Sequence, residues 1–273
     1  MITFPFAKVN LGLRILRRRP DDYHDIESVL YPVAWKDSLE FLPSVHQNFR
    51  SFGLHVERHG QADLCERAYH MIKETYPLPP VDIALLKSIP AGAGLGGASS
   101  DAAAMLTELN KCFGLKITEV ELNEIATRIG SDCPFFLQKQ PAFVYERGDR
   151  MKEISLSLDN YQFLIAYPGI AVSTPEAYRH CRPSGRPLDW QRLLREPPSA
   201  WGDFLVNDFE ESVFEAYPAI GKLKEKIKEM GALYASMSGS GSAVYGIFHE
   251  APFSIDAAAA LDLPPEYVYS DNQ

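Results

Sequence analysis

The sequence has few cysteines, and none of them lies in an arrangement that binds metal. Its four cysteines, Cys65, Cys112, Cys133 and Cys181, form no C-x-x-C pair, and its seven histidines form no cluster with ligand spacing. Structural zinc sites and redox dithiols are built from such close pairs. We therefore expect a protein of the reducing cytoplasm, without structural zinc.

The sequence also lacks an excess of positive charge and any long apolar run. With 27 Lys and Arg against 36 Asp and Glu, its net charge is −9. This balance argues against nucleic acid or an anionic membrane surface as the main partner. No apolar run approaches the ~20 residues of a transmembrane helix, and the N-terminus lacks the residue order of a secretory signal. The 273 residues, 46% of them hydrophobic, indicate a soluble globular protein long enough for two domains.

What the chain does contain is a glycine-rich segment at residues 90–100, with the sequence PAGAGLGGASS. Glycines let backbone amides approach a ligand closely, and a helix that follows adds aligned N–H donors. The helix is predicted from an apolar stripe that ends before Gly114, formed by Ala102, Met105, Leu106, Leu109 and Phe113. We predict that this first glycine loop (residues 90–100) binds phosphate.

The type of phosphate loop is less obvious from the residues. Gly92, Gly94 and Gly97 match G-x-G-x-x-G, but the loop lies about 90 residues into the chain rather than after a first strand. Gly97 is followed by Ala-Ser-Ser, whereas a Walker A loop needs a lysine there. The hydroxyls of Ser99 and Ser100 could bind a phosphate oxygen or a water on Mg²⁺. The simplest alternative is a tight turn capped by Ser99.

Strand and helix patterns intermix along the chain without regular alternation, which indicates α+β sandwiches. Thr118 and Glu121 form a capping box, and Thr174 with Pro175 is typical of an N-cap and first helical residue. A basic run at 17–19 ends the first strand and could help to hold an anionic substrate. We predict strands at 2–16, 26–41, 81–86, 142–145, 151–154, 161–167 and 243–248, helices at 62–74 and around 220–230, loop or short helix at 182–200, and a domain boundary near 157.

A second small-residue segment, Met237-Ser238-Gly239-Ser240-Gly241-Ser242-Ala243, precedes the strand that ends at Phe248. Alone, this second glycine loop (residues 237–243) is typical of a flexible hairpin turn. Paired with the first glycine loop, it gains a further interpretation, because two such loops from two domains can close over one ligand.

In chain order, three motifs resemble those of the GHMP kinase family: PFAKVNLGL from Pro5, the first glycine loop, and MSGSGSAVYG from Met237. Tyr23-His24 and the GSDCPFF segment from Gly130 resemble the branch that phosphorylates a cytidine diphosphate substrate for non-mevalonate isoprenoid synthesis. Asp22 stands where that branch has glycine. The resemblance covers nearly the whole chain. It implies an α+β, two-domain GHMP kinase fold: an N-terminal α/β sandwich with a left-handed βαβ unit over 1–157, and a C-terminal ferredoxin-like α/β domain over 158–273.

The resemblance also implies the chemistry, which is transfer of a phosphoryl group from ATP to the 2-hydroxyl of a methylerythritol unit. Lys8 matches the active-site lysine and Asp132 the catalytic base. A helix N-terminus would keep Asp132 ionised, and Lys8 would neutralise the attacking oxygen and the transferred group. We therefore expect the two side chains to converge beside the terminal phosphate. From the residues alone, a surface lysine and a plain N-cap aspartate are the alternatives.

Binding residues follow from the same resemblance. His24 would pair with the cytosine base between Tyr23 and Tyr178, and Asn10 would orient the substrate near Lys8. Further substrate contacts are predicted at Thr174, Ser238, Gly239, Ser240 and Gly241. ATP contacts are predicted at Pro90, Ala91, Gly92, Ala93, Gly94, Leu95, Gly96, Gly97, Ala98, Ser99 and Ser100, with Lys87 and Leu64 as weaker candidates for the adenosine pocket.

Several expectations remain open at this point. Asp63 is discounted because the family has asparagine there, and residues 44–61, where the family contacts adenine, show no pattern that we can assign. Mg²⁺ is expected as a cofactor beside ATP, and a monomer or weak homodimer is expected. The alternatives are another GHMP kinase acting on homoserine, mevalonate or a sugar, a nucleotide-binding module without chemistry, and, more distantly, a dinucleotide oxidoreductase.

Overall fold

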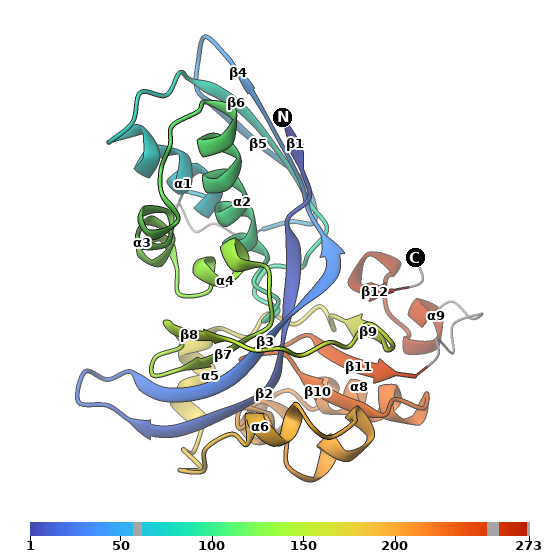
Figure 1. Ribbon diagram of the computed structural model, residues 1–273. Helices are drawn as coiled ribbons and strands as arrows, with labels where there is room; N and C mark the ends of the chain where they lie inside the picture. The colour runs from blue at the N-terminus through green and yellow to red at the C-terminus, as the bar shows by residue number, and fades with distance from the viewer. Residues whose placement is uncertain (57–61, 250–256, 272–273) are drawn as a thin grey trace. The chain divides into compact units, whose positions relative to one another are not determined.

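The computed structural model describes residues 1–56, 62–249 and 257–271 (Figure 1). Its contacts group into two compact units: unit 1 comprises residues 1–7, 34–91 and 96–139, and unit 2 comprises residues 8–33, 92–95 and 140–273. Two long strands, β2 (Phe6–Arg18) and β3 (His24–Lys36), contribute residues to both units. Each unit therefore combines segments that are remote in sequence, and the linear division near residue 157 stays a prediction.

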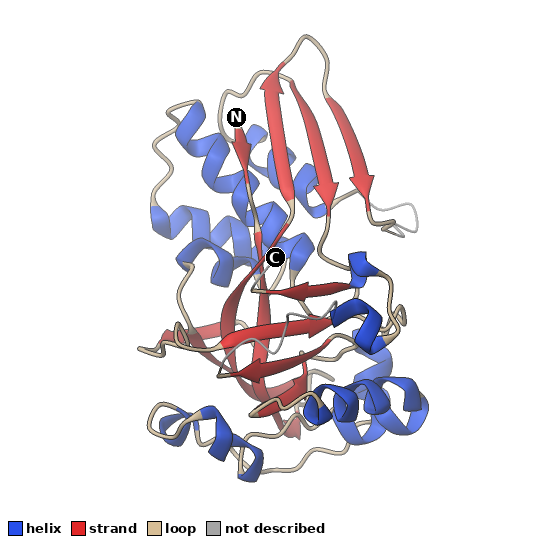
Figure 2. Cartoon of the chain, turned by 90° about the vertical axis from the view of Figure 1, so that its right-hand side faces the viewer, coloured by secondary structure: helices blue, strands red, loops and turns tan. Residues whose placement is uncertain are grey.

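Unit 1 contains a four-stranded sheet with strand order β1-β4-β6-β5. Its strands are β1 (Ile2–Thr3), β4 (Ser38–Pro43), β5 (Asn48–Gly53) and β6 (Val81–Lys87). β5 and β6 run parallel, and a parallel pair needs a crossover. Helix α1 (Leu64–Lys73) lies in that crossover, so β5, α1 and β6 form a βαβ unit. One face of the sheet is covered by α1, α2 (Gly97–Cys112), α3 (Glu119–Ile129) and α4 (Cys133–Gln138) (Figure 2).

The core of unit 1 confirms the predicted apolar stripe. Alternate residues of β4 and β6, such as Phe41 and Ile83, pack in one cluster with residues of the helices. The α2 stripe contributes four fully buried side chains to it: Ala102, Met105, Leu106 and Leu109. The capping box of Thr118 and Glu121 is present at the start of α3. The buried stripe packs α2 against the sheet. The first glycine loop leads directly into that helix.

The described residues of unit 2 form two four-stranded sheets. One has the order β2-β3-β7-β8, with β7 (Ala142–Tyr145) and β8 (Arg150–Glu153). The other has the order β10-β11-β9-β12, with β9 (Gln162–Ala166), β10 (Tyr234–Met237), β11 (Val244–Phe248) and β12 (Val268–Ser270). Its helices are α5 (Thr174–His180), α6 (Trp190–Leu193), α7 (Glu210–Ala216), α8 (Pro218–Glu229) and α9 (Ala257–Leu261), with 3₁₀ turns at Pro198–Asp203 and Pro265–Tyr267. The order of the β9–β12 strands and their helices is that of a ferredoxin-like domain.

Three local predictions are corrected by the structure. The predicted strand at 2–16 is two strands, β1 and β2, separated at Phe4 and Pro5. The predicted strand at 26–41 is two strands, β3 and β4, separated at Asp37, whose carboxylate accepts hydrogen bonds from the amides of Ser88 and Ile89. The N-cap of α5 is Ser173 rather than Thr174, because the Ser173 hydroxyl accepts the Glu176 amide at 3.3 Å. Within the described ranges, no helix combines the length and apolar character needed to cross a membrane.

Candidate active site

The first glycine loop enters α2 through a glycine in the left-handed backbone region. Gly96 is the N-cap, with a φ of +72°, and no side chain caps the first turn of the helix. The first turn contains no acidic residue either. Aligned backbone N–H groups at an uncapped helix start attract anions. This geometry supports the phosphate-binding interpretation, and it removes the alternative of a turn capped by Ser99.

Behind this helix start lies a buried charge cluster formed by Asp37, Lys87 and Asp101. The Lys87 ammonium donates to the carboxylates of Asp37 and Asp101, the latter at 2.6 Å. Lys87 is 4% exposed and Asp101 1% exposed. A Cβ atom added to Gly97 would lie 3.2 Å from the Lys87 Nζ. Lys87 therefore supports the loop from within unit 1, a placement that favours positioning over the predicted direct contact with ATP.

Asp132 lies at the start of α4, also in unit 1. It occupies the N-cap position but makes no capping hydrogen bond from its side chain, so it is not a plain N-cap aspartate. The next residue, Cys133, is hydrogen-bonded to Ser99 from the first turn of α2. Burial raises the pKa of the Cys133 thiol to about 11, and the bond to Ser99 opposes that shift in part. The residue that follows the candidate base is thus bonded to the first turn of α2.

Lys8 lies on β2 in unit 2, in a part of the strand that is buried on both faces. Lys8 is 4% exposed, and its neighbours Ala7 and Val9 are fully buried, so the alternative of a surface lysine is wrong. Its ammonium donates to the Gly94 carbonyl at 2.9 Å and to the Asn10 Oδ1 at 2.6 Å. The predicted convergence of Lys8 with Asp132 stays a prediction, since the two residues belong to different units.

The second glycine loop meets residues 92–95 of the first glycine loop within unit 2. The Ser238 hydroxyl donates to the Gly94 carbonyl at 2.8 Å and accepts the Asn10 amide at 3.2 Å. A Cβ atom added to Gly94, whose φ is +76°, would lie 2.0 Å from the Ser238 carbonyl oxygen. The loop is therefore a packed part of the site rather than a flexible turn. It brings together Lys8, Asn10, Gly94 and Ser238, four of the predicted site residues.

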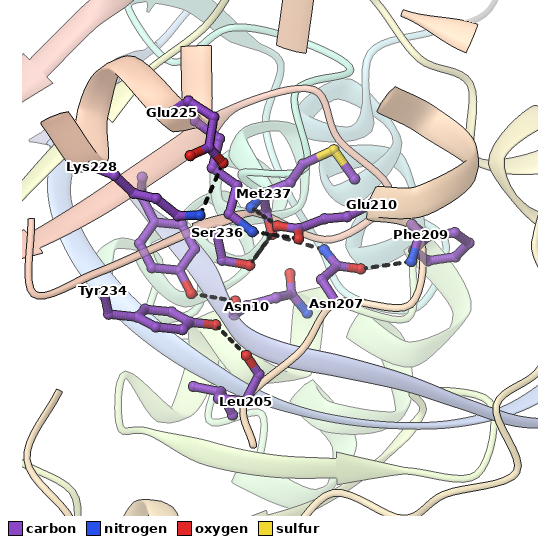
Figure 3. Close-up of polar contacts among 12 residues, drawn as sticks. Asn10, Leu205, Asn207, Phe209, Glu210, Glu225, Lys228, Tyr234, Ser236 and Met237 are labelled. Carbon is purple, nitrogen blue, oxygen red and sulfur yellow. Dashed lines mark hydrogen bonds and ion pairs between the residues drawn. The ribbon is translucent and has the colours of Figure 1, made fainter. Parts of the chain in front are cut away.

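Two residues that were not predicted from the sequence, Asn207 and Glu210, form hydrogen bonds to the backbone of the second glycine loop. The Asn207 amide group donates to the carbonyls of Met237 and Gly239, both at 2.8 Å. The Glu210 carboxylate accepts the Met237 amide at 2.8 Å (Figure 3). Both residues lie in the run Asn-Asp-Phe-Glu that leads into α7. The run Asn-Asp-Phe-Glu is mostly polar, and nothing in its local pattern indicates that Asn207 is buried against a loop about 30 residues away.

The predicted cytidine residues fall into two groups in unit 2. The His24 ring stacks on the Tyr178 ring, with centroids 4.7 Å apart. Burial and, to a smaller extent, Arg18 lower the pKa of His24, which favours the neutral imidazole with one donor and one acceptor. Tyr23 is 60% exposed, and its ring faces the Arg147 guanidinium at 5.2 Å rather than His24. The His24 ring thus lies against Tyr178, and the flanking of a cytosine base by Tyr23 and Tyr178 stays a prediction.

The remaining predicted residues are placed as follows. The Thr174 and Ser240 hydroxyls lie 3.1 Å apart, so Thr174 joins the second glycine loop. Asp22 adopts a φ of +64°, a left-handed conformation that aspartate tolerates better than most residues. Asp63 caps α1 through a capping box with Glu66, and Leu64 begins that helix. Of the unassigned stretch 44–61, residues 57–61 lie outside the described residues.

The basic run at 17–19 does not form a free cationic patch. Arg17 and Arg19 both pair with Asp25, at 2.6 Å each, and Arg18 pairs with Asp22 at 2.8 Å. Each guanidinium thus has a carboxylate partner close by in sequence. Arg17 and Arg18 are largely exposed, where such pairs contribute little to stability, and a role of the run in holding an anionic substrate stays a prediction.

Two family models and several named relatives match this chain over most of its length. The GHMP kinases N-terminal domain model matches residues 63–140, and the GHMP kinases C-terminal model matches residues 190–260. A 4-diphosphocytidyl-2-C-methyl-D-erythritol kinase of Parabacteroides distasonis is 45% identical over 250 residues, covering 92% of this chain and 92% of that protein. The chain belongs to the GHMP kinase family.

Other relatives of this GHMP kinase carry the same name. One from Cytophaga hutchinsonii is 46% identical over 253 residues, covering 92% of this chain and 94% of that protein. The crystal structure of a 4-(cytidine 5'-diphospho)-2C-methyl-D-erythritol kinase matches with a TM-score of 0.82 at 30% identity, covering 99% of this chain and 97% of that chain. The predicted two-domain GHMP kinase fold is thereby confirmed, and use of ATP follows from membership of this kinase family.

Proposed function

We propose that this GHMP kinase transfers the terminal phosphoryl group of ATP to the 2-hydroxyl of 4-diphosphocytidyl-2-C-methyl-D-erythritol, within non-mevalonate isoprenoid precursor synthesis. The observation that carries the proposal is the likeness, at 45–46% identity over more than nine-tenths of each chain, to relatives of that name. The Tyr23-His24 pair and the segment around Asp132 support this substrate over homoserine, mevalonate or a sugar.

The residues of the site fit the needs of phosphoryl transfer. An alcohol becomes a competent nucleophile when a positioned carboxylate accepts its proton, and Asp132 takes that role. Transfer itself depends mainly on positioning and on neutralising charge. The uncapped start of α2 binds the phosphates, and the Lys8 ammonium, held by Gly94 and Asn10, neutralises the attacking oxygen and the moving group.

Mg²⁺ is proposed to enter with the nucleotide. Among the residues that the structure describes, no group of three or more His, Cys, Asp or Glu is able to hold a metal ion. Magnesium in nucleotide sites is bound largely by phosphates and water, with one or two protein groups, and it would supply further neutralisation of phosphate charge. Ser99 is half-buried whereas Ser100 is 1% exposed, so Ser99 is the better candidate to reach a metal-bound water.

The cytosine base is proposed to be recognised by His24, with Tyr178 providing an aromatic face. A neutral imidazole can donate one hydrogen bond and accept another, which suits the edge of a pyrimidine. The four cysteines form no disulfide, in keeping with action in a reducing cytoplasm. The proposal of a monomer or weak homodimer is retained.

A panel of acceptor alcohols tests which substrate the protein phosphorylates. The purified protein is incubated with Mg-ATP and, separately, the cytidine diphosphate substrate, homoserine, mevalonate and galactose, and ADP release is followed. We expect turnover with the cytidine substrate alone. Turnover with only one of the other three would overturn the proposed substrate while leaving the family intact.

Replacement of the candidate base tests the mechanism. Asp132→Asn should retain ATP binding but lose at least ~10²-fold in kcat, as expected for removal of a general base. Asp189→Asn is the matched control, because Asp189 is also an N-cap and accepts the Arg192 amide at 3.0 Å. Near-normal turnover by Asp132→Asn would remove Asp132 from this role.

A further inference from the structure

The run Asn207-Asp208-Phe209-Glu210 has no part in the chemistry described so far, yet Asn207 is among the most buried polar residues of unit 2. It is 1% exposed. Its Nδ2 group donates to the carbonyls of Met237 and Gly239, both at 2.8 Å, and its Oδ1 accepts the Phe209 amide at 3.0 Å. One carboxamide thus uses both of its donors on the second glycine loop (Figure 3).

The two carbonyls that Asn207 binds belong to the residues on either side of Ser238. A pair of hydrogen bonds to residues i and i+2 fixes the backbone of the residue between them. Glu210 reinforces this arrangement, since its carboxylate accepts the Met237 amide at 2.8 Å and pairs with Lys224 at 2.5 Å. The end of β10 and the start of the second glycine loop are therefore held by two side chains of one short run.

From Ser238 the contacts continue to the candidate catalytic lysine. The Ser238 hydroxyl donates to the Gly94 carbonyl at 2.8 Å, and the same carbonyl accepts the Lys8 ammonium at 2.9 Å. Asn10 closes the arrangement, because its amide donates to Ser238 and its Oδ1 accepts Lys8 at 2.6 Å. A Cβ atom at Gly239 would lie only 3.2 Å from that Oδ1, so the loop packs closely against Asn10.

We propose that Asn207 is a positioning residue for phosphoryl transfer. It holds the second glycine loop in the conformation in which Ser238 supports the Gly94 carbonyl, and that carbonyl in turn holds the Lys8 ammonium. The kinetic part of the proposal rests on the proposed function, whereas the anchoring of the loop does not. A buried asparagine with a purely structural role would lower stability when replaced, but it would leave turnover by the folded protein unchanged.

The test is Asn207→Asp, which keeps the shape and the oxygen that accepts the Phe209 amide. It removes both donors and places an oxygen opposite the Met237 and Gly239 carbonyls. We expect faster hydrogen exchange of the amides at 237–243. We also expect a loss in kcat on the order of 10-fold to 100-fold, as small misplacements of catalytic groups produce, with a smaller change in the KM for ATP.

The matched control is Asn110→Asp in unit 1. The Asn110 amide forms a similar clip, donating to the Ile117 carbonyl at 2.9 Å and accepting the Ile117 amide at 3.0 Å. This variant should lose stability but keep its kcat and the exchange rates at 237–243. If Asn207→Asp does not fold, Asn207→Ser, whose hydroxyl can replace one donor, is measured in the same two ways.

The outcomes separate the two proposals. Faster exchange together with reduced kcat in a folded Asn207 variant supports the positioning role. Unchanged exchange at 237–243, or a kcat that matches the Asn110→Asp control, overturns it. If the wild-type protein fails to phosphorylate the cytidine substrate, the proposed function fails, and the exchange comparison alone then decides whether Asn207 anchors the loop.

Discussion

The buried cluster of Asp37, Lys87 and Asp101 leads to a specific prediction about stability and pH. Burial raises the pKa of Asp101 from 3.8 to about 8. The negative charge of Asp37 adds to this shift, and the positive charge of Lys87 opposes it. One carboxylate oxygen of Asp101, Oδ1, is buried and has no hydrogen-bond partner. The ionised form of this side chain is therefore costly in the folded protein, and Asp101→Asn removes the ionisable group while keeping an oxygen for Lys87.

The sign of the effect follows from proton linkage. Between the unfolded pKa of 3.8 and the folded pKa of about 8, the folded protein keeps a proton on Asp101 that the unfolded chain releases. The free energy of unfolding therefore falls as the pH rises through this window. Each pH unit changes it by at most ~1.4 kcal/mol per proton, so Asp101 alone lowers the free energy of unfolding by up to about 4 kcal/mol between pH 5 and pH 8. The raised pKa of Lys87 keeps the ammonium charged throughout this range.

Urea unfolding at pH 5, 6, 7 and 8 measures this dependence. Asp101→Asn should cost a roughly constant amount, on the order of 1–3 kcal/mol, for a buried amide group that lacks a partner, and its stability should vary much less with pH. Asp149→Asn is the control. Burial opposes ionisation of Asp149, but the hydrogen bond from Arg147 and other contacts outweigh it and lower the pKa, so this carboxylate adds no slope above pH 5. Parallel pH curves for the wild type and Asp101→Asn would refute the reasoning.

Two further predictions concern the packing around Lys8. Gly94→Ala places a methyl group 2.0 Å from the Ser238 carbonyl oxygen at a φ of +76°. We therefore expect the free energy of unfolding to fall by roughly 1–3 kcal/mol, as measured by thermal unfolding, and turnover to drop markedly, as measured by ADP release. Wild-type values in both assays would contradict the contact. Tyr245→Phe removes the hydroxyl that donates to the Asn10 carbonyl at 2.9 Å, so urea unfolding should show a loss of about 1 kcal/mol, and an unchanged midpoint would mean that this carbonyl finds another donor.

Local patterns predicted much of the fold. The apolar stripe of α2 and the capping box of α3 were readable because each depends on residues three or four apart. The phosphate loop was readable for the same reason, since its glycines lie next to the helix that they begin. The N-cap of α5 was misplaced by one residue because Ser173 and Thr174 are both good capping residues, and only the hydrogen bond to Glu176 distinguishes them.

Contacts between remote segments could not be predicted in this way. Alternation along β2 indicates one buried face, but around Lys8 the strand is buried on both. The position of Lys87 in β6, on the same face as Ile83 and Leu85, indicates that it points into the core. Its partners Asp37 and Asp101 come from other elements, and nothing in the local sequence identifies them. Asn207 is a similar case, because the two carbonyls that its amide group binds lie about 30 residues away.

The hydrogen bond from the Asn10 amide to the Ser238 hydroxyl joins residues 228 positions apart. During synthesis, the first glycine loop emerges long before the serine that secures it. A ribosome-bound or proteolytically shortened chain that stops ahead of Ser238 would contain every phosphate-loop residue and still leave the Lys8 ammonium without that support. The packing around Lys8 is therefore a late event of folding, because it depends on a residue 228 positions beyond Asn10.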